Sequence, residues 1–389
     1  MHGIEWELRF LKEMVAMPTV AGDDDAYRRM EKFLVSACRR LGGKVKVIDP
    51  MRDGKSKVPK PNIIADFDYG KDKTVVLNCH YDVVPSGDGW RSNPFRMLTK
   101  SGKVYGRGTC DDKGPLALSV GLVREMNSAK RRNYNIRLML TCDEEVGSEL
   151  GLKYVIGRTR VKDIDLAIVM DAHRVPIAGC SGVVQGRFMI KGLQWHAGED
   201  WRGRNAILDG MRFIGAMQGF KRIRARHLSR LELSETDAPY RKVFGRFNIT
   251  KVKSGHAPNV MPGEFEATFD MRLIPEEDPD AAIGELKRYV KKVENRTGIK
   301  VPFEITMKSS GYSTDLKNGL VRKFIKADNA SKAYGTWGGL DGRFFAEKRI
   351  PTIAYGIPLG NSTDHAANEY VVLKDMQKAK ETLVRFAMG

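Results

Sequence analysis

Short apolar segments alternate with segments of helical pattern in the first part of the chain, and this alternation restricts the possible folds more than any other feature. Residues 4–17 place apolar side chains on one helical face, residues 26–41 form a helix that ends before Gly42, and residues 115–126 are also helical in pattern. The predicted strands are 44–49, 62–67, 74–80, 136–142 and 166–172. Strands that alternate with helices form sheets covered by helices on both faces. We therefore expect a doubly wound α/β domain with a mixed sheet.

The order of elements changes near Ser181. From there the segments read strand, helix, strand, strand, helix and strand, which is the order of a ferredoxin-like βαββαβ unit. The segments are VVQGRFMIKGL, AILDGMRFIGAMQ, VFGRFNITKV, EFEATFDMRLI, AAIGELKRYVKKVENR and KVPFEITM. After them the α/β character returns. We therefore predict an α/β domain built from residues 1–180 and 311–389, with a second domain inserted at residues 181–310.

Length and composition agree with two globular domains. A chain of 389 residues exceeds the size at which one hydrophobic core keeps growing, and 42% of the residues are hydrophobic. No apolar run approaches the roughly 20 residues of a membrane helix, and the start MHGIEWELRF carries acids where a signal peptide carries basic residues. We expect a cytoplasmic protein without a membrane segment. The five cysteines are widely spaced without a C-x-x-C pair, so we expect reduced thiols in the core.

The formal charge of +18 at pH 7 has three explanations. The run KRIRARHLSR at residues 221–230 would suit a phosphate backbone, but no zinc finger, RNA-recognition motif or other nucleic-acid module accompanies it. A solvated basic face is the favoured interpretation. An acidic substrate or an acidic partner protein is the third. We expect no nucleic acid as a partner.

Acids and histidines gather where the predicted strands end. In an α/β sheet, functional groups collect at the carboxyl ends of the strands, so these side chains are expected to meet at one edge. A lone aspartate at the end of a strand is usually a cap or turn residue. Chance alone is a poor explanation for a whole set of acids and histidines at the ends of several strands. The candidates are His80 and Asp82 after 74–80, Asp111 in GKVYGRGTCDDKGP (102–115), Glu144 and Glu145 after 136–142, Asp171 in 166–172, and His365 in NSTDHAANE (361–369).

The chemistry of this set suits zinc. Imidazole and carboxylate groups are hard and borderline ligands, and one carboxylate shared by two ions would complete a co-catalytic pair. His80 and Asp82 lie two residues apart on one face of an extended segment, so Asp82 can orient the imidazole. Glu144 and Glu145 are adjacent and therefore diverge, so one can bind metal while the other remains a free base. The set therefore predicts a two-metal site.

Four motifs stand out in order and spacing: HYDVVP at 80–85, GRGTCDDKG at 106–114, DEEVG at 143–147 and HAANE at 365–369. Together they resemble the motifs of a zinc metallopeptidase and deacylase family. Its members include aminoacylases, acetylornithine deacetylases, succinyl-diaminopimelate desuccinylases, carnosine-type dipeptidases and glutamate carboxypeptidases. The resemblance covers nearly the whole chain, including the inserted segment.

Carried onto this chain, the resemblance implies two zinc ions, with cobalt or manganese as substitutes. Asp111 would bridge the two ions. His80 and Asp171 would bind the first ion, and the family often has glutamate at the position of Asp171. Glu145 and His365 would bind the second ion. The family also tends to hold the peptide bond after its bridging aspartate in the cis form.

The resemblance also implies roles beyond metal binding. Glu144 would be the general base, and Asp82 would orient a metal-binding histidine. In the insertion, His196 of GLQWHAG, Asn259 of GHAPNVMPG and Arg272 of DMR match positions that the family uses on substrate, and His196 would stabilise the oxyanion. The resemblance thus assigns a catalytic role to residues far apart in the sequence.

Some of these residues also have structural explanations. His196 fits an ordinary strand-end histidine, and Arg272 fits an ion pair with Asp270. The run GGLDGRFF (338–345) departs from the family's usual GGTSDARFF-like sequence, which leaves a role of Arg343 in substrate binding open.

The predicted function is hydrolysis of the amide bond in N-acyl amino acids, of acetyl or succinyl type, or in short peptides. HYDVVPSGDGW and GRGTCDDKGP resemble the dipeptidase branch, whereas DEEVGS resembles the deacetylase and desuccinylase branch, so a dipeptidase or carboxypeptidase is the alternative. A basic nucleic-acid- or partner-binding protein on a hydrolase scaffold is the alternative of another class, but the intact ligand set argues against it. The family typically dimerises through its inserted lid domain, so the resemblance also implies a homodimer.

Overall fold

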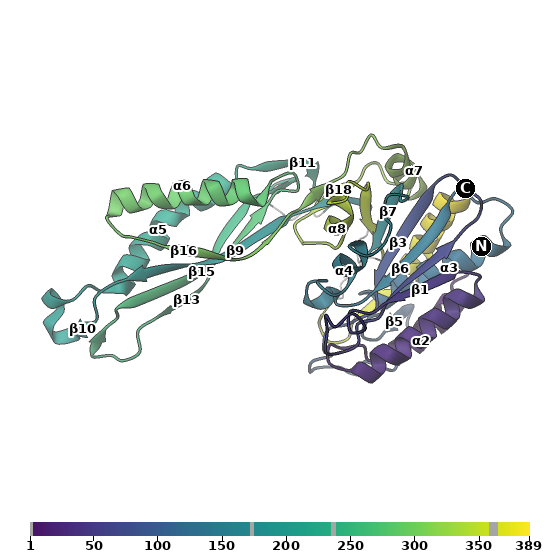
Figure 1. The fold of residues 1–389 in the computed structure, drawn as a ribbon, viewed down its shortest axis with the longest axis horizontal. Coiled ribbons are helices and arrows are strands. Elements are labelled where there is room, and N and C mark those ends of the chain that lie inside the picture. The colour runs from purple at the N-terminus through teal and green to yellow at the C-terminus, as the bar shows by residue number, and fades with distance from the viewer. Residues whose placement is uncertain (1–2, 172–174, 235–238, 358–364) are drawn as a thin grey trace. The chain divides into compact units, whose positions relative to one another are not determined.

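The structure is a computed structural model that describes residues 3–171, 175–234, 239–357 and 365–389 (Figure 1). The chain divides into two compact units. The first unit is Met1–Ala178, Thr314–Ala333 and Leu340–Gly389, and the second unit is Gly179–Ser313 and Tyr334–Gly339. The second unit interrupts the first, in the part of the chain where the sequence places an insertion.

A mixed sheet forms the centre of the first unit. Seven of its nine strands are, in order across the sheet, β1 (Lys44–Ile48), β2 (Asn62–Phe67), β6 (Asn135–Thr141), β3 (Thr74–His80), β7 (Leu166–Met170), β19 (Thr352–Tyr355) and β8 (Ile177–Cys180). The neighbours β6, β3, β7 and β19 run parallel, so their carboxyl ends lie at one edge. Strands β2 and β8 run antiparallel to their neighbours, which confirms the predicted mixed sheet.

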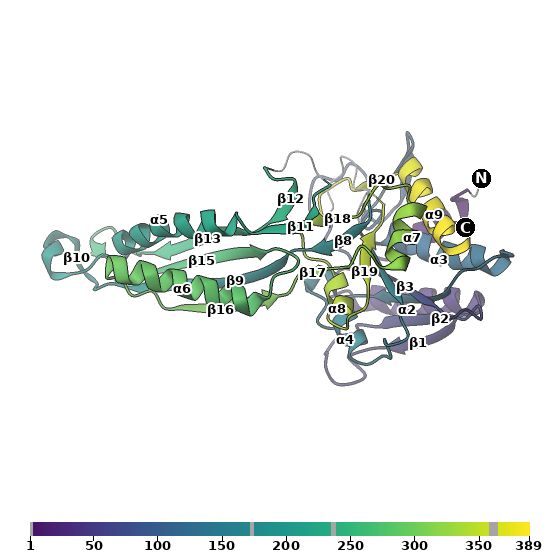
Figure 2. The same cartoon turned by 90° about the horizontal axis from the view of Figure 1, so that it is seen from above.

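Helices cover both faces of this sheet (Figure 2). On one face lie α1 (Glu5–Val15), α2 (Asp24–Arg40), α3 (Lys113–Ser128), α7 (Gly319–Ala327) and α9 (Leu373–Met388), and on the other lie α4 (Leu152–Ile156) and α8 (Gly342–Ala346). Leu166, Ile168 and Met170 of β7 belong to the core shared with the first group of helices. The alternate residues Ala167 and Val169 are buried outside that core, where α8 contacts β7. This is the doubly wound arrangement expected from the sequence.

Local sequence sets the ends of α2. The helix begins two residues before its predicted start at Ala26, because Asp23 accepts a hydrogen bond from the backbone N–H of Ala26 (2.9 Å) and caps the first turn. It ends before Gly42, which adopts a φ of +85° that glycine tolerates best.

The second unit contains a four-stranded antiparallel sheet. Its strands are β9 (Gly182–Lys191), β13 (Arg246–Ser254), β15 (Glu264–Leu273) and β16 (Phe303–Ser309), in the order β13-β15-β9-β16. Helices α5 (Ala206–Arg224) and α6 (Pro279–Thr297) share a phenylalanine-rich core with this sheet that includes Phe188, Phe213 and Phe269. The main elements therefore follow the order βαββαβ.

The predicted strand at 243–252 is divided into two strands. β12 (Lys242–Phe244) pairs with β11 (Leu228–Glu232), and β13 begins after Gly245. A Cβ at residue 245 would lie 2.5 Å from the carbonyl oxygen of Arg224, so glycine is needed for this close approach. The remaining short elements are β4 (Leu98–Lys100), β5 (Lys103–Tyr105), η1 (Glu144–Val146), β10 (Trp195–His196), η2 (Ala197–Arg202), β14 (Val260–Met261), β17 (Tyr312–Ser313), β18 (Tyr334–Thr336) and β20 (Tyr370–Val372).

The cysteines lie in the interior of the protein. All five cysteines are buried and form no disulfide, which confirms their predicted place in the core. Within the described ranges, no helix has both the length and the apolar character to span a bilayer.

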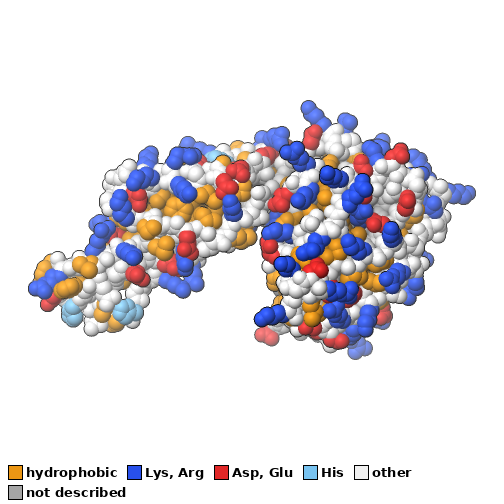
Figure 3. Space-filling view, viewed as in Figure 1, with side chains coloured by type: hydrophobic (Ala, Val, Ile, Leu, Met, Phe, Trp, Pro, Cys, Tyr) orange, Lys and Arg blue, Asp and Glu red, His pale blue; other side chains and the backbone are white. Residues whose placement is uncertain are grey.

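The basic run 221–230 is not uniformly exposed, because Arg224 is buried and pairs with Glu277 (2.5 Å) and Glu285 (2.7 Å). Elsewhere Lys and Arg side chains are spread over the visible faces of both units (Figure 3).

Candidate active site

The carboxyl ends of the four parallel strands carry residues that the sequence singled out. His80 is the last residue of β3, and η1 with Glu144 and Glu145 follows β6. Asp171 directly follows β7, and His365 lies in the connection after β19. Because parallel neighbours present their carboxyl ends at one edge, these residues gather there.

A small three-stranded sheet brings the Asp111 loop beside the His365 segment. β5 pairs antiparallel with β20, and β4 completes the sheet. Residues 106–111 follow β5 directly, and residues 365–369 directly precede β20. The pairing therefore joins two segments that are distant in the sequence. No pattern in the sequence predicted these strands, because each is only three residues long.

Asp111 lies between two histidines. Its Oδ1 is 2.8 Å from Nε2 of His80, and its Oδ2 is 3.3 Å from Nε2 of His365. The same His365 nitrogen is 3.0 Å from Oε2 of Glu145. Ligand atoms of His80, Asp111 and Glu145 all lie within 4.8 Å of one another. A carboxylate that offers one oxygen to each of two histidines has the arrangement needed to bridge two metal ions, and the donor set fits zinc.

Burial makes the charges of this cluster act strongly on one another. Burial raises the pKa of Glu145 to about 7. The attraction of His80 lowers this pKa, and the repulsion of Asp111 raises it further. Burial would also raise the pKa of Asp111, but hydrogen bonds from His365 and His80 hold it below its ordinary value. Burial would lower the pKa of His80, but its bonds to Asp111 and Asp82 raise it well above its ordinary value. A divalent cation would relieve the repulsion among the acids.

Glu144 lies beside this cluster and is not among its three grouped ligands. Burial raises the pKa of its carboxyl well above the ordinary value, the nearby His80 opposes this rise, and Asp341 and Asp171 add to it. A carboxylate with a raised pKa is a stronger proton acceptor in general base catalysis. Glu145 thus belongs to the group that could hold a metal ion and Glu144 does not, and the role of Glu144 as the base stays a prediction.

Two buried acids hold His80. Asp112 accepts a hydrogen bond from the backbone N–H of His80 (3.0 Å), and the peptide bond between Asp111 and Asp112 is cis, as the resemblance implied. Nδ1 of His80 lies 3.1 Å from the carbonyl oxygen of Asp82 and 3.4 Å from its Oδ1. The other carboxylate oxygen of Asp82 accepts a hydrogen bond from the backbone N–H of Glu145 (3.2 Å). Asp82 therefore links the ring of one ligand to the backbone of another.

Asp171 is placed by a backbone contact with the neighbouring strand. Its N–H donates to the carbonyl oxygen of Tyr355 in β19 (2.9 Å). Burial raises the pKa of Asp112 well above its ordinary value. The charge of His80 opposes this rise, and the negative charge of Asp171 adds to it. Asp171 is therefore electrostatically close to the cluster, and its role as a ligand stays a prediction.

Glu369 holds the loop that carries Asp111, a role that the sequence did not reveal. Its carboxylate accepts hydrogen bonds from the backbone N–H groups of Gly108 (2.8 Å), Cys110 (2.7 Å) and Asp111 (3.3 Å). It also pairs with Arg107 at 2.7 Å, and both side chains are buried. The only signal in the sequence was the last residue of HAANE, which says nothing about the partners.

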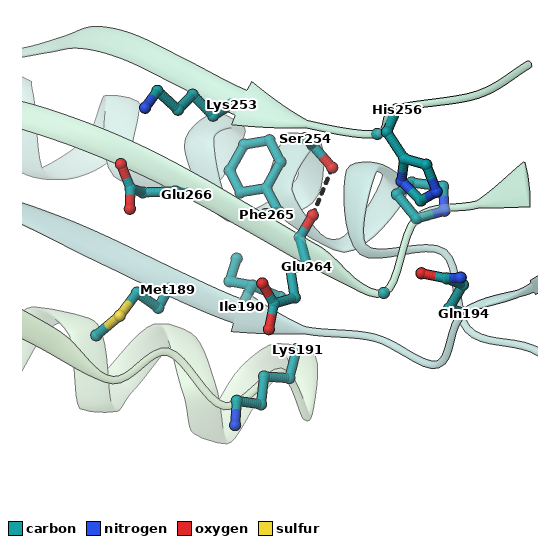
Figure 4. A pocket seen from close by; sticks show the side chains of 13 residues that line it. Met189, Ile190, Lys191, Gln194, Lys253, Ser254, His256, Glu264, Phe265 and Glu266 are labelled. Carbon is teal, nitrogen blue, oxygen red and sulfur yellow. Dashed lines mark hydrogen bonds between the residues drawn. The ribbon is translucent and has the colours of Figure 1, made fainter.

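His196 and Asn259 lie together in the second unit. His196 is exposed on β10, which pairs with β14, and β14 begins directly after Asn259. The carbonyl oxygen of Asn259 accepts a hydrogen bond from the N–H of Ala197 (2.9 Å). Gln194 and His256, from the same two segments, line a hollow of about 480 Å³ (Figure 4). The structure thus brings two predicted substrate residues of the insertion close to each other.

Arg272 and Arg343 each lie near an acid of their own unit. Nε of Arg272 is 2.8 Å from Oδ1 of Asp270, which is the structural ion pair considered from the sequence. Arg343 lies on α8, partly buried, 3.9 Å from Asp341. Contact of either arginine with substrate stays a prediction.

Comparison with known proteins agrees with this geometry. The profile of Peptidase family M20/M25/M40 matches residues 76–389, a range that contains all four motifs and the insertion. The chain belongs to this family. It is therefore a hydrolase that acts on amide bonds, in a family whose members depend on metal.

Relatives of this M20/M25/M40 peptidase cover most of its length. An uncharacterised metallohydrolase of Methanocaldococcus jannaschii is 29% identical over 354 residues, which is 84% of this chain and 83% of the relative. A succinyl-diaminopimelate desuccinylase of Sulfurovum sp. is 29% identical over 335 residues, 80% of this chain and 83% of the relative. An M20 family metallo-carboxypeptidase from Sulfolobus solfataricus has the same fold, with a TM-score of 0.75, 19% identity and 98% of both chains covered.

Proposed function

We propose that this protein is a two-zinc hydrolase that deacylates N-acyl amino acids of acetyl or succinyl type or cleaves short peptides. The observation that carries the proposal is the position of Asp111, whose two oxygens face His80 and His365 at 2.8 and 3.3 Å. In this proposal Asp111 would be shared by the two ions. His80 and Asp171 would hold one ion, and Glu145 and His365 would hold the other. Cobalt or manganese can take the place of zinc.

The residues around the metals would divide the chemistry among them. Bound zinc would polarise the substrate carbonyl and lower the pKa of water. Glu144 accepts the proton of the attacking water and transfers it to the leaving amine. The raised pKa of Glu144, which burial causes, suits both transfers. Asp82 keeps the ring of His80 oriented through Nδ1.

Four further residues are proposed to act on the substrate. His196 stabilises the oxyanion, and Asn259, Arg272 and Arg343 bind the substrate. The resemblance of the surrounding motifs supports these roles. The proximity of His196 to Asn259 agrees with both residues contacting the same substrate. Arg343 is supported least, because its run GGLDGRFF departs from the family pattern.

An acidic acyl group is the favoured substrate feature. The Sulfurovum relative is named a succinyl-diaminopimelate desuccinylase, and the charge of +18 suits an acidic substrate. The motifs HYDVVPSGDGW and GRGTCDDKGP, which resemble the dipeptidase branch, keep dipeptides as the second candidate.

A substrate panel tests this proposal. Purified protein loaded with zinc is incubated with succinyl amino acids, acetyl amino acids and dipeptides, and the released amine is measured. We expect metal-dependent release from at least one class, with succinyl compounds hydrolysed fastest because they add a carboxylate. Fastest hydrolysis of dipeptides would move the substrate to the second candidate. Failure of every class would contradict the proposed function.

We also propose a homodimer formed through the second unit. The supporting observation is that β13 and β16 are the outer strands of its sheet and offer edges for pairing. Binding of nucleic acid has less support, because Arg224, in the densest basic run, is buried in ion pairs with Glu277 and Glu285.

A further inference from the structure

The turn that carries Glu144 and Glu145 closes on itself within six residues. Its first and last residues, Asp143 and Ser148, both have left-handed backbone conformations, with φ of 71° and 62°. The N–H of Ser148 donates to the carbonyl oxygen of Asp143 (2.6 Å) and closes the turn. Left-handed conformations are unfavourable for residues other than glycine unless the surroundings hold them. We call residues 143–148 the acid turn.

Apolar packing does not hold the acid turn. Its one large apolar side chain, Val146, is 62% exposed and therefore contributes little apolar packing, and Glu144 and Glu145 are partly buried. The residues on which the proposed chemistry depends therefore lie on a segment without a hydrophobic anchor. Polar contacts at its two ends, together with the hydrogen bond from the N–H of Glu145 to Asp82, fix its geometry.

Lys60 anchors the first end. Its Nζ lies 2.8 Å from Oδ1 of Asp143, and both side chains are more than nine-tenths buried. The other oxygen of Asp143 accepts a hydrogen bond from the N–H of Leu150 (2.9 Å). Asn62, two residues after Lys60, accepts from the N–H of Cys142 (3.2 Å) and donates to the carbonyl oxygen of Leu150 (3.0 Å). Lys60 and Asn62 thus hold the chain on both sides of the turn.

Asp341 anchors the second end. The hydroxyl of Ser148 donates to its carboxylate, with both carboxylate oxygens 2.6 Å away, and both residues are buried. Asp341 belongs to GGLDGRFF, the run whose departure from the family pattern had no explanation in the sequence. The chain enters α4 just beyond the turn through Gly151, where a Cβ would lie 1.9 Å from the carbonyl oxygen of Cys142.

We propose that Lys60 and Asp341 are positioning residues that fix the acid turn from its two ends and thereby set the directions of Glu144 and Glu145. The proposal rests on the proposed function, in which Glu144 is the base and Glu145 binds metal. Each residue acts through a neighbour, Lys60 through Asp143 and Asp341 through Ser148. Loss of either anchor does not remove the two glutamates, but it allows the turn that carries them to move.

Ser148→Ala and Lys60→Met remove one anchor each without touching either glutamate. Because a shift of about 1 Å in a reacting group costs roughly 100-fold in rate, we expect kcat to fall at least tenfold with KM little changed. Asp341→Asn and Lys60→Arg keep an acceptor for the Ser148 hydroxyl or the charge, respectively, and should retain more of kcat than the first two variants. The measurements are made on folded, zinc-loaded protein, well below its Tm.

Two matched controls remove similar buried contacts elsewhere. Ser229 donates to Glu276 (2.9 Å) in the second unit, and Lys380 of α9 pairs with Glu7 of α1 (2.9 Å). Ser229→Ala and Lys380→Met should lower Tm but leave kcat unchanged. If Ser148→Ala and Lys60→Met only lower Tm, as these controls do, the positioning role is wrong.

Glu144→Ala, measured beside these variants, separates the two proposals. If it is inactive while Ser148→Ala and Lys60→Met keep full kcat, only the positioning role fails. If Glu144→Ala itself keeps full activity, the proposed function fails. If Ser148→Ala does not fold, Asp341→Asn decides, because an asparagine keeps an oxygen that accepts from the hydroxyl of Ser148 and should preserve the folded turn and most of kcat. An asparagine variant with normal Tm but a kcat as low as that of Lys60→Met would contradict the proposal.

Discussion

Replacing Glu144 with alanine is expected to lower kcat by about 10²- to 10⁴-fold while the protein keeps its bound metal. The reason is that, in the proposed function, Glu144 moves the proton during hydrolysis but does not belong to the group of His80, Asp111 and Glu145 that could hold a metal ion. Glu149→Ala is the matched control, because Glu149 is exposed and pairs with the exposed Lys153 at 2.6 Å. The measurements are kcat with the preferred substrate and metal content by elemental analysis.

Glu145→Ala should behave differently from Glu144→Ala. Glu145 lies 3.0 Å from His365 in the ligand cluster, so its loss should weaken metal binding itself and lower activity as a consequence. Excess zinc should recover part of the activity of Glu145→Ala and none of that of Glu144→Ala. Equal metal loss in the two variants would show that the roles of base and ligand have been assigned wrongly to Glu144 and Glu145.

Glu369→Ala is expected to give the largest loss of stability, about 3–5 kcal/mol in the free energy of unfolding. The substitution leaves the buried Arg107 without its carboxylate partner at 2.7 Å. It also removes the acceptor of the N–H groups of Gly108, Cys110 and Asp111. Since these groups shape the loop that presents Asp111, metal affinity should fall together with stability.

Chemical denaturation and metal titration measure the two effects. Glu381→Ala is the control, since Glu381 forms an exposed pair with Arg385 at 3.7 Å and should contribute no more than about 1 kcal/mol. A Glu369→Ala variant as stable as this control would mean that the buried pair does not hold the loop.

The sequence predicted the part of the site that follows from strand order. His80, Glu144 and Asp171 each come directly after an apolar segment, and the rule that parallel strands end at one edge placed them together. The alternation of helices and strands likewise predicted the mixed sheet, because strands and helices leave different hydrophobic periods in the sequence.

Contacts between distant polar residues left no comparable signal. Glu369 meets Arg107 across more than 250 residues, and Ser148 meets Asp341 across nearly 200, so no local pattern relates either pair. The division of the strand at 243–252 also escaped prediction, because it depends on how closely Gly245 approaches Arg224. Tertiary packing decides such features after the local pattern has set the elements.

The central claim, a two-metal centre bridged by Asp111, is tested most directly by counting metal ions and activity together. Zinc-loaded protein is analysed for metal before and after a chelator, then after zinc or cobalt is returned, and Asp111→Ala is treated in the same way. The account predicts about two ions per chain, loss of activity with the ions, recovery on their return, and little bound metal in Asp111→Ala. Full hydrolysis by metal-free protein, or an unchanged metal content in Asp111→Ala, would contradict it.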